Sequence, residues 1–460
     1  MILSFSVANF RSFREEQTLS MVASTRQPDH TDHLWKIPDL EDSLLPVALI
    51  YGANGSGKSN LVKALSFASE LVLKGTEPGK TIRRQPFLFG GIDAKQPSSF
   101  EVRFVADGKA FAYGFKVTDK EVVEEWLDLF RGTREINLFE RVTRADGVVA
   151  VEAGDGLSDD GFGNHAKVVA LTKVGVRANQ LFLAGVRESL DPAGYGPLLA
   201  AVLNWFDSIV VVPPDANFGQ LAEWVAKDAK FAEFAGEFLR DAATGVARLL
   251  VETTELKDGA AGLPTEVLRK FMGDAKPGEV RMLQLGAMGE VIAERGEGTK
   301  LLLRTIRAEH KSADGSPVPL PFQEESDGTQ RLTHLLPALF QLQNQKRVYV
   351  IDEIDRSLHP LLSRKFIEFF LHACKGQGSQ ILLTTHESNL MDLDLLRRDE
   401  LWFTEKDAQG ATSIYSLSDY KVRTDLKIDK GYLHGRFGAI PFLGNLDRLL
   451  DQLKPEEPCR

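Results

Sequence analysis

The chain has 460 residues, of which 43% are hydrophobic and 26% are charged, as expected for a globular protein with a sizeable core. Its net charge of −10 argues against a protein coated in basic surface, although it leaves room for a local basic patch that binds nucleic acid. Two cysteines, Cys374 and Cys459, are too few for a disulfide framework or a metal-ligand cluster, so we expect a reducing cytoplasmic compartment.

The N-terminal segment and the apolar runs predict a protein without membrane contact. No stretch approaches the roughly 18 uninterrupted apolar residues of a membrane span. Residues 1–7 carry no basic region and no small-residue cleavage site, which argues against a signal peptide. We predict that they form a buried first strand.

A glycine-rich octapeptide, GANGSGKS at residues 52–59, directly follows the apolar run 47–51. A strand, such a loop and a helix start in this order are what a phosphate-binding loop requires. The glycines let backbone N–H groups face phosphate oxygens, Lys58 can reach the β- and γ-phosphates, and Ser59 can bind Mg²⁺. The sequence therefore predicts a nucleoside triphosphate site and a helix over 59–73. We expect the nucleotide contacts to come from Asn54, Gly55, Gly57, Lys58, Ser59 and Asn60.

Alternating apolar residues on both sides of Asp107-Gly108 predict a β-hairpin. Both positions of such a two-residue turn need positive φ, which Asp-Gly tolerates. The alternating residues are Phe100, Val102 and Phe104 before the turn and Phe111, Tyr113, Phe115 and Val117 after it. They indicate an antiparallel β layer attached to the nucleotide-binding core.

Residues 165–295 show a mostly helical pattern without the sustained heptads of a coiled-coil arm. The apolar residues at three- to four-residue spacings are Leu221, Trp224, Val225, Phe231, Phe234 and Phe238. We predict an α/β fold in three segments: an N-terminal lobe with the β layer over 1–160, an inserted mainly helical subdomain over 161–295, and a C-terminal lobe over 296–460.

Two acids, Asp352 and Glu353, follow the apolar strand predicted at 348–351. At the end of a buried parallel strand, the aspartate can hold Mg²⁺ through water, and the glutamate can polarise a water for attack on the γ-phosphate. The alternative is a pair of solvated acids. A second apolar strand at 381–384 leads to His386, which lies thirty-three residues after Glu353. Its ring N–H can sense the γ-phosphate.

The segment Glu325–Arg331 starts another predicted helix, and by itself it is an ordinary capped helix start. Together with the loop and the acids, however, it resembles the ABC-type P-loop ATPase head of the branch shared by SMC proteins, RecF and the OLD nucleases. That branch carries an element like Asn9-Phe10-Arg11-Ser12-Phe13 after its opening strand. The resemblance implies that Arg11 contacts nucleotide phosphates and that ATP and Mg²⁺ are bound between paired heads. It also implies a signature motif that acts in trans on the partner's nucleotide, formed by Ser326, Gly328, Thr329 and Gln330.

The chain departs from transporter-type members at Asp327, where those carry glycine. An acid there would repel a phosphate unless its side chain points away. Gln85 is one candidate for the Gln loop of the superfamily.

Further segments resemble bacterial stand-alone AAA-family ATPases of antiphage operons, including the ATPase of the PARIS system and those paired with RloB-like proteins. The segments that carry this resemblance are Pro97–Val102, Glu125–Leu127, Leu138–Arg141, Asn179–Leu183 and Gly435–Pro441. It implies an ATPase in abortive infection or antiviral defence that controls a separate effector protein, such as a nuclease or toxin. Only about 40 residues follow the last predicted strand at 412–417, so we expect any nuclease to be another chain.

Two other functions stay open: a RecF- or SMC-like ATPase that binds DNA in repair or loading, and a nucleotide-dependent scaffold in which Glu353 is idle.

Two further groups of residues contain types found in catalytic or metal sites, but each has a simpler explanation. Asp29-His30-Thr31-Asp32-His33 contains metal-ligand types, yet a solvated loop is favoured. Arg304 and His310 loosely resemble an RNase-type pair, which chance explains.

Overall fold

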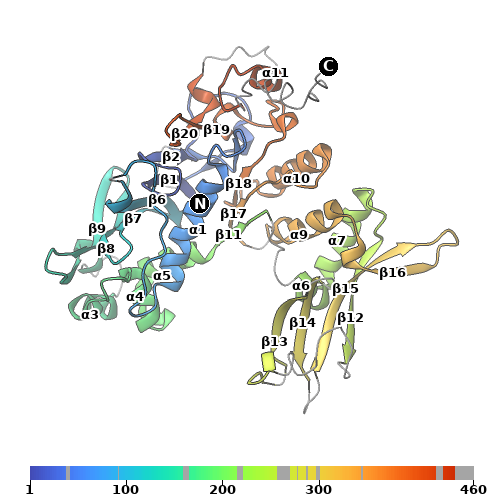
Figure 1. Ribbon diagram of the computed structural model, residues 1–460, viewed down its shortest axis with the longest axis horizontal. Helices are drawn as coiled ribbons and strands as arrows, with labels where there is room; N and C mark the ends of the chain where they lie inside the picture. The colour runs from blue at the N-terminus through green and yellow to red at the C-terminus, as the bar shows by residue number, and fades with distance from the viewer. Residues whose placement is uncertain are drawn as a thin grey trace, which may run out of the picture. The chain divides into compact units, whose positions relative to one another are not determined.

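A computed structural model describes residues 1–37, 42–91, 93–158, 165–214, 221–255, 270–276, 278–285, 289–296, 301–342, 345–420 and 428–440. The chain divides into two compact units (Figure 1). The terminal unit comprises Ile2–Asp207 and Thr384–Arg460, and the central unit comprises Met1 and Ser208–Leu383. This division differs from the three segments predicted from the sequence. Among the described residues, no helix is both long enough and apolar enough to cross a membrane.

The terminal unit is built from two main groups of strands and a short two-stranded sheet, with helices alongside. Its strands are β1 (Ile2–Ala8), β2 (Gln17–Ser20), β3 (Trp35–Lys36), β4 (Ser43–Leu44), β5 (Val47–Tyr51), β6 (Ser98–Ala106), β7 (Lys109–Val117), β8 (Val122–Arg131), β9 (Arg134–Thr143), β10 (Val149–Ala153), β19 (Leu401–Lys406) and β20 (Thr412–Ser416). Its helices are α1 (Lys58–Lys74), α2 (Asp155–Ser158), α3 (Ala166–Val174), α4 (Phe182–Ser189), α5 (Gly196–Asp207) and α11 (Ile428–Leu433). Its 3₁₀ turns are η1 (Thr31–His33), η2 (Asp93–Lys95), η4 (Pro192–Gly194), η8 (Ser388–Leu390), η9 (Arg398–Glu400) and η10 (Leu417–Asp419).

The larger group of strands is an antiparallel sheet in the order β10-β9-β8-β7-β6-β1-β2. It confirms the predicted β layer and the first strand. Asp107 and Gly108 join β6 to β7 with φ of 47° and 73°, as the two-residue turn requires. Phe100 of β6 lies 5.3 Å from Phe67 of α1, and Phe104 of β6 stacks on Trp205 of α5 at 3.9 Å between ring centroids. Since residues four apart on a strand share a face, α1 and α5 cover the same side of the sheet.

The smaller group carries the predicted nucleotide loop. The β5 strand pairs in parallel with β19, which pairs antiparallel with β20. All five residues of β5 are buried, and its end leads into the glycine-rich loop and α1. Both the strand at 47–51 and the helix after the loop were predicted.

The central unit contains three parallel strands and a second sheet. Its strands are β11 (Ile209–Val212), β12 (Arg248–Glu255), β13 (Val280–Leu285), β14 (Gly289–Arg295), β15 (Leu301–Lys311), β16 (Pro317–Pro321), β17 (Val348–Ile351) and β18 (Gln380–Thr384). Its helices are α6 (Leu221–Lys227), α7 (Ala229–Asp241), α9 (Asp327–Gln341) and α10 (Pro360–Ala373), with the 3₁₀ turn η7 (Phe322–Glu324). Strands β11, β17 and β18 pair in parallel in that order, which confirms that the two apolar strands predicted to carry site residues run side by side.

The prediction of a mainly helical insert over 161–295 is only partly right. Helices α3 to α7 lie where the helical spacing is found, but β12, β15, β14 and β13 form an antiparallel sheet in that order. The spacing of residues 221–238 does not continue into β12, where Val251, Thr253 and Thr254 are β-branched and favour an extended backbone. Among the described residues, the helical expectation therefore fails at β12, β13 and β14.

Candidate functional site

The glycine-rich loop has the backbone that only glycine adopts without strain. Gly55 and Gly57 have φ of 78° and 119°. A Cβ added at Gly57 would lie 2.4 Å from Thr412 Oγ1, whereas one at Gly55 would meet nothing within 4 Å. Packing against Thr412 therefore requires glycine at position 57. Gly55 lies on the open side of the loop next to exposed Asn54.

Lys58 is the first residue of α1 and is 5% exposed. Its Nζ donates to the carbonyl oxygens of Gly52 and Ala53 at 2.7 and 3.3 Å, at the start of the loop. The ammonium group is therefore held against the loop backbone, beside the N-terminus of α1. Ser59 and Asn60 follow it on the helix and are half-buried.

His386 lies beside this lysine, although 328 positions separate them in the sequence. The distance from Lys58 Nζ to His386 Nδ1 is 3.4 Å. The backbone places the histidine there, because Thr385 N donates to Ile50 O of β5 at 3.1 Å. The imidazole is exposed on its other side. The structure thus brings together the loop lysine and the histidine, while a γ-phosphate-sensing role remains a prediction.

Ser12 joins the element Asn9–Phe13 to the loop, a role that the sequence reasoning missed. Its Oγ accepts from Asn60 Nδ2 and from Thr412 Oγ1, both at 2.8 Å. Thr412 Oγ1 also lies 2.7 Å from Ser56 O, within the loop itself. Nothing in the sequence pattern marks Thr412, which comes from β20 and meets Ser12 across 400 positions.

Arg11 precedes Ser12 and has an unsatisfied buried nitrogen. Its φ is 52°, and its backbone N donates to Gln85 O at 2.6 Å, which places the Gln-loop candidate beside it. Its Nε is buried without a hydrogen-bond partner among the described residues. Burial lowers the pKa of the guanidinium. A partly desolvated cation of this kind is stabilised by an anionic ligand.

In the central unit, Asp352 and Glu353 follow β17 as predicted. Asp352 is 2% exposed, and its backbone O accepts from Arg331 Nη2 of α9 at 3.1 Å. Glu353 is half-buried with a φ of 52°, a conformation that costs a non-glycine residue free energy and is found at functional sites. A hydrogen bond from Arg356 N to Glu353 O at 3.1 Å holds the turn that imposes it.

The predicted signature motif starts α9. Ser326 caps the helix, with its Oγ accepting from Thr329 N at 3.2 Å, and Gln330 Nε2 donates to the carbonyl oxygen of Glu325 at 2.8 Å. A Cβ on Gly328 would lie 2.6 Å from Ser357 O, so the first turn of α9 packs against the segment that follows the acid pair. Asp327 is exposed in this first turn, where an acid is favoured by the helix dipole.

The RNase-like pair has structural partners. Arg304 forms an ion pair with Glu294 across β14 and β15, and His310 Nε2 lies 2.6 Å from Glu325 Oε1. These contacts agree with the interpretation that their resemblance to a nuclease pair is chance.

Comparison with known proteins finds a family match over part of the chain, including most of the candidate site residues. Residues 47–164 and 294–392 match the family described as AAA domain, putative AbiEii toxin, Type IV TA system. These ranges contain the glycine-rich loop, the α9 start, the acid pair and His386. The chain is therefore similar to AAA-type ATPases in those segments. No curated protein matches the chain.

The solved structures similar to the chain include three SMC head domains. The SMC head domain from Thermotoga maritima has 15% identity and a TM-score of 0.36, covering 90% of this chain and 98% of its own. An SMC head bound to the C-winged helix domain of ScpA has 12% identity and a TM-score of 0.35, covering 90% and 97%. An SMC head with an extended coiled coil, bound to the C-terminal domain of ScpA derived from Pyrococcus furiosus, has 12% identity and a TM-score of 0.33, covering 95% and 98%.

Proposed function

We propose that the protein is a Mg²⁺-dependent ATPase whose paired heads bind and hydrolyse ATP and thereby control a separate effector protein in bacterial antiphage defence. The observation that carries the proposal is the 3.4 Å approach of His386 Nδ1 to Lys58 Nζ. It joins two of the motif residues, one before and one after the central unit, at the glycine-rich loop. A cation and an imidazole at a helix N-terminus are suited to a γ-phosphate.

The residues of the terminal unit fit a triphosphate. Gly55 leaves open space on the loop, and Lys58 provides a cation next to the N-terminus of α1. Arg11 has a buried nitrogen without a partner in the described part of the chain, so a phosphate oxygen would satisfy it. Adenine as the base rests on the resemblance to ATPases.

In the proposed reaction, water attacks the γ-phosphorus and the bond to the β,γ-bridging oxygen breaks, releasing ADP and phosphate. Glu353 accepts a proton from the attacking water, and Lys58 offsets the charge that builds on the phosphate oxygens. Ser59 and Asp352 are the proposed Mg²⁺ ligands, and bound Mg²⁺ would supply further charge neutralisation. His386 would report on the γ-phosphate through its ring N–H.

Pairing of two heads would complete each site with a signature from the partner. The exposed start of α9, with Ser326 as its cap, is the proposed contact to the opposite γ-phosphate. Gly328, Thr329 and Gln330 would position that turn. Control of an effector is supported by the matched family, whose description includes a toxin of a toxin–antitoxin system, and by the resemblance to ATPases of antiphage operons.

Nucleotide binding and phosphate release by matched variants test the ATPase. We expect Lys58→Ala to abolish nucleotide binding. We expect Glu353→Gln to bind ATP but to hydrolyse it on the order of a hundred-fold or more slowly, because it cannot accept the proton. Lys63→Ala, an exposed lysine on the same helix, and Glu324→Gln, an exposed acid in η7, should behave as wild type. A Glu353→Gln variant that hydrolyses ATP at the wild-type rate would favour another base.

The effector control is tested separately, by purifying the chain with the product of the adjacent reading frame. We expect the partner's activity to differ between the ATP-trapped Glu353→Gln state and the nucleotide-free Lys58→Ala state. A partner whose activity is the same in every nucleotide state contradicts this half of the proposal and leaves the ATPase half standing.

A further inference from the structure

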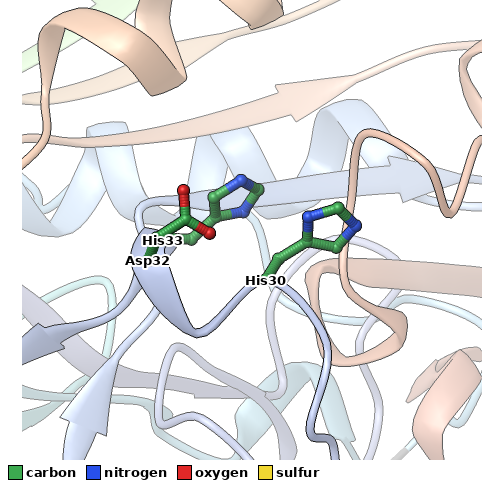
Figure 2. Close-up of side chains that lie close together, drawn as sticks. All are labelled: His30, Asp32 and His33. Carbon is green, nitrogen blue, oxygen red and sulfur yellow. The ribbon is translucent and has the colours of Figure 1, made fainter.

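Three side chains with metal-ligand chemistry gather on one turn of the terminal unit. His30, Asp32 and His33 each offer a ligand atom, and these atoms all lie within 4.8 Å of one another (Figure 2). The two imidazole rings stack, with centroids 4.9 Å apart and planes inclined by 19°. The turn η1 brings them together, whereas the sequence alone favoured a solvated loop. Asp32 is exposed, and the two histidines are half-buried.

Each histidine has one ring nitrogen close to an acceptor, and proteins orient metal-binding imidazoles through partners of this kind. His30 Nε2 lies 2.7 Å from Leu393 O. His33 Nδ1 lies 3.5 Å from Oε1 of Glu400, a carboxylate that is completely buried. With those nitrogens facing acceptors, we assign the ligand roles to the Nδ1 of His30 and the Nε2 of His33.

The contact between His33 and Glu400 is an independent observation that supports a bound cation at this cluster. Neither His33 Nδ1 nor Glu400 Oε1 makes a well-aligned hydrogen bond among the described residues, and both atoms are buried. The other carboxylate oxygen, Oε2, accepts from Arg397 N at 2.8 Å. A cation on the far nitrogen of His33 would polarise its Nδ1–H toward this carboxylate and strengthen the contact.

The segment that carries the cluster is anchored before any ligand arrives. Arg397, which is 1% exposed, forms an ion pair with Asp399 at 2.9 Å and donates to the carbonyl oxygens of Asp29 and Ser24. Asp399 Oδ2 in turn accepts from Ser24 N at 2.7 Å. This buried network fixes the backbone on the N-terminal side of His30, so binding would order few additional residues.

We propose that His30, Asp32 and His33 bind one divalent transition-metal ion through two imidazole nitrogens and one carboxylate oxygen. This donor set suits Zn²⁺ and its probe Co²⁺ rather than Mg²⁺, which prefers oxygen ligands alone. Ligands at about 2.0–2.2 Å from tetrahedral Zn²⁺ lie roughly 3.3–3.6 Å apart, so small side-chain rotations close the cluster. The ion would cross-link the turn at residues 30–33 and, through His33, strengthen its contact with Glu400 just before β19, whatever the outcome for the proposed ATPase.

Titration of the full chain with Zn²⁺ or Co²⁺ alone, without nucleotide, tests the site. We expect one equivalent to bind, with Co²⁺ giving the visible absorption of a site with nitrogen ligands. His30→Ala and His33→Ala should each lose this equivalent. His372→Ala, an exposed histidine on α10, and Asp352→Asn, at the proposed Mg²⁺ position, should keep it. No stoichiometric binding to the wild type, or binding that survives His33→Ala, would overturn the proposal.

The buried carboxylate of Glu400 allows a second test, which distinguishes a specific site from nonspecific metal binding at the surface. Glu400→Gln leaves all three ligands in place but weakens the acceptor for His33 Nδ1–H. We expect the affinity for Zn²⁺ to fall about 10- to 100-fold, as for other partners of metal-bound histidines. Zn²⁺ should raise the Tm of the wild type but not that of His33→Ala. If Glu400→Gln folds and binds Zn²⁺ as tightly as the wild type, the proposed orientation of His33 is wrong.

Discussion

Asp128 on β8 is a buried acid whose ionisation opposes folding. Asp128 is 8% exposed, and its Oδ1 accepts a hydrogen bond from Asn137 Nδ2 at 2.9 Å. Burial, with a smaller contribution from the neighbouring acids Glu135, Glu140 and Glu101, raises the pKa of this carboxyl to about 6 against the opposing effect of the hydrogen bond. The folded state therefore keeps a proton that the unfolded chain has already lost above its ordinary pKa.

The raised pKa of Asp128 in the folded state makes the protein lose stability as the pH rises. Because the folded pKa is raised, the stabilising contribution of Asp128 is complete below the ordinary aspartate range and is lost as the pH rises through about 6. Asp128→Asn has no charge to bury. We expect urea denaturation to show a gain of about 1 kcal/mol for this variant at pH 8, allowing for solvent screening, and little gain at pH 4.

Glu152→Gln, on the exposed part of β10 in the same sheet, is the control for this pH effect. It should show no comparable gain between the two pH values. A stability difference between Asp128→Asn and the wild type that stays constant from pH 4 to pH 8 would mean that Asp128 titrates alike in both states.

Packing of α9 against the segment after β17 depends on one glycine. In an exposed helix, replacing glycine by alanine adds up to about 1 kcal/mol of stability. At Gly328 the added Cβ would lie 2.6 Å from the backbone oxygen of Ser357, which cannot move aside as a flexible side chain can. Overpacking of this kind costs about 1–3 kcal/mol and outweighs the helix propensity.

We therefore expect Gly328→Ala to be destabilised in urea denaturation by up to about 2 kcal/mol, which is the overpacking cost less the gain in helix propensity. Asp327→Ala, one residue earlier and exposed, should lose only about 0.5 kcal/mol of interaction with the helix dipole. Equal losses in the two variants would argue that α9 does not rest against Ser357.

Elements with a strong local pattern were predictable, and those fixed by distant partners were not. The β6–β7 hairpin and the loop before α1 follow from neighbouring residues alone. Contacts of the loop with Thr412 depend on β20, some 350 positions away, and no short pattern encodes such a meeting. The same limit applies to β12, whose eight residues pair with β15 about 50 positions later.

Two of the segments that resemble antiphage ATPases, Glu125–Leu127 and Asn179–Leu183, contact each other inside the terminal unit. Glu125 of β8 accepts from Tyr113 at 2.9 Å and from the backbone N of Leu183 at 3.1 Å, at the start of α4. Arg141 of β9 donates to Ala178 O at 2.9 Å. These side chains tie the helix to the sheet, so their role in this chain is structural. Pro441 of the last segment lies outside the described residues.

For the molecule as a whole, the proposed pairing makes a prediction that one chain alone cannot satisfy. If Ser326 acts on the partner's nucleotide while Lys58 and Glu353 act on their own, defects at Ser326 and Lys58 should complement each other in a mixed pair. Ser326→Asp is the suitable partner variant, because aspartate still caps α9 but places a negative charge toward the phosphate.

An equimolar mixture of Lys58→Ala and Ser326→Asp chains should recover about a quarter of the wild-type ATPase rate, since half of randomly formed pairs are mixed and each mixed pair has one intact site. Mixing Lys58→Ala with Glu353→Gln is the control and should recover nothing, because both defects then remain on the nucleotide's own chain. Phosphate release after exchange of subunits measures both. Recovery in the control but not in the first mixture would place Glu353 in trans and Ser326 in cis, which reverses the proposed roles. No recovery in either mixture would favour a head that works alone.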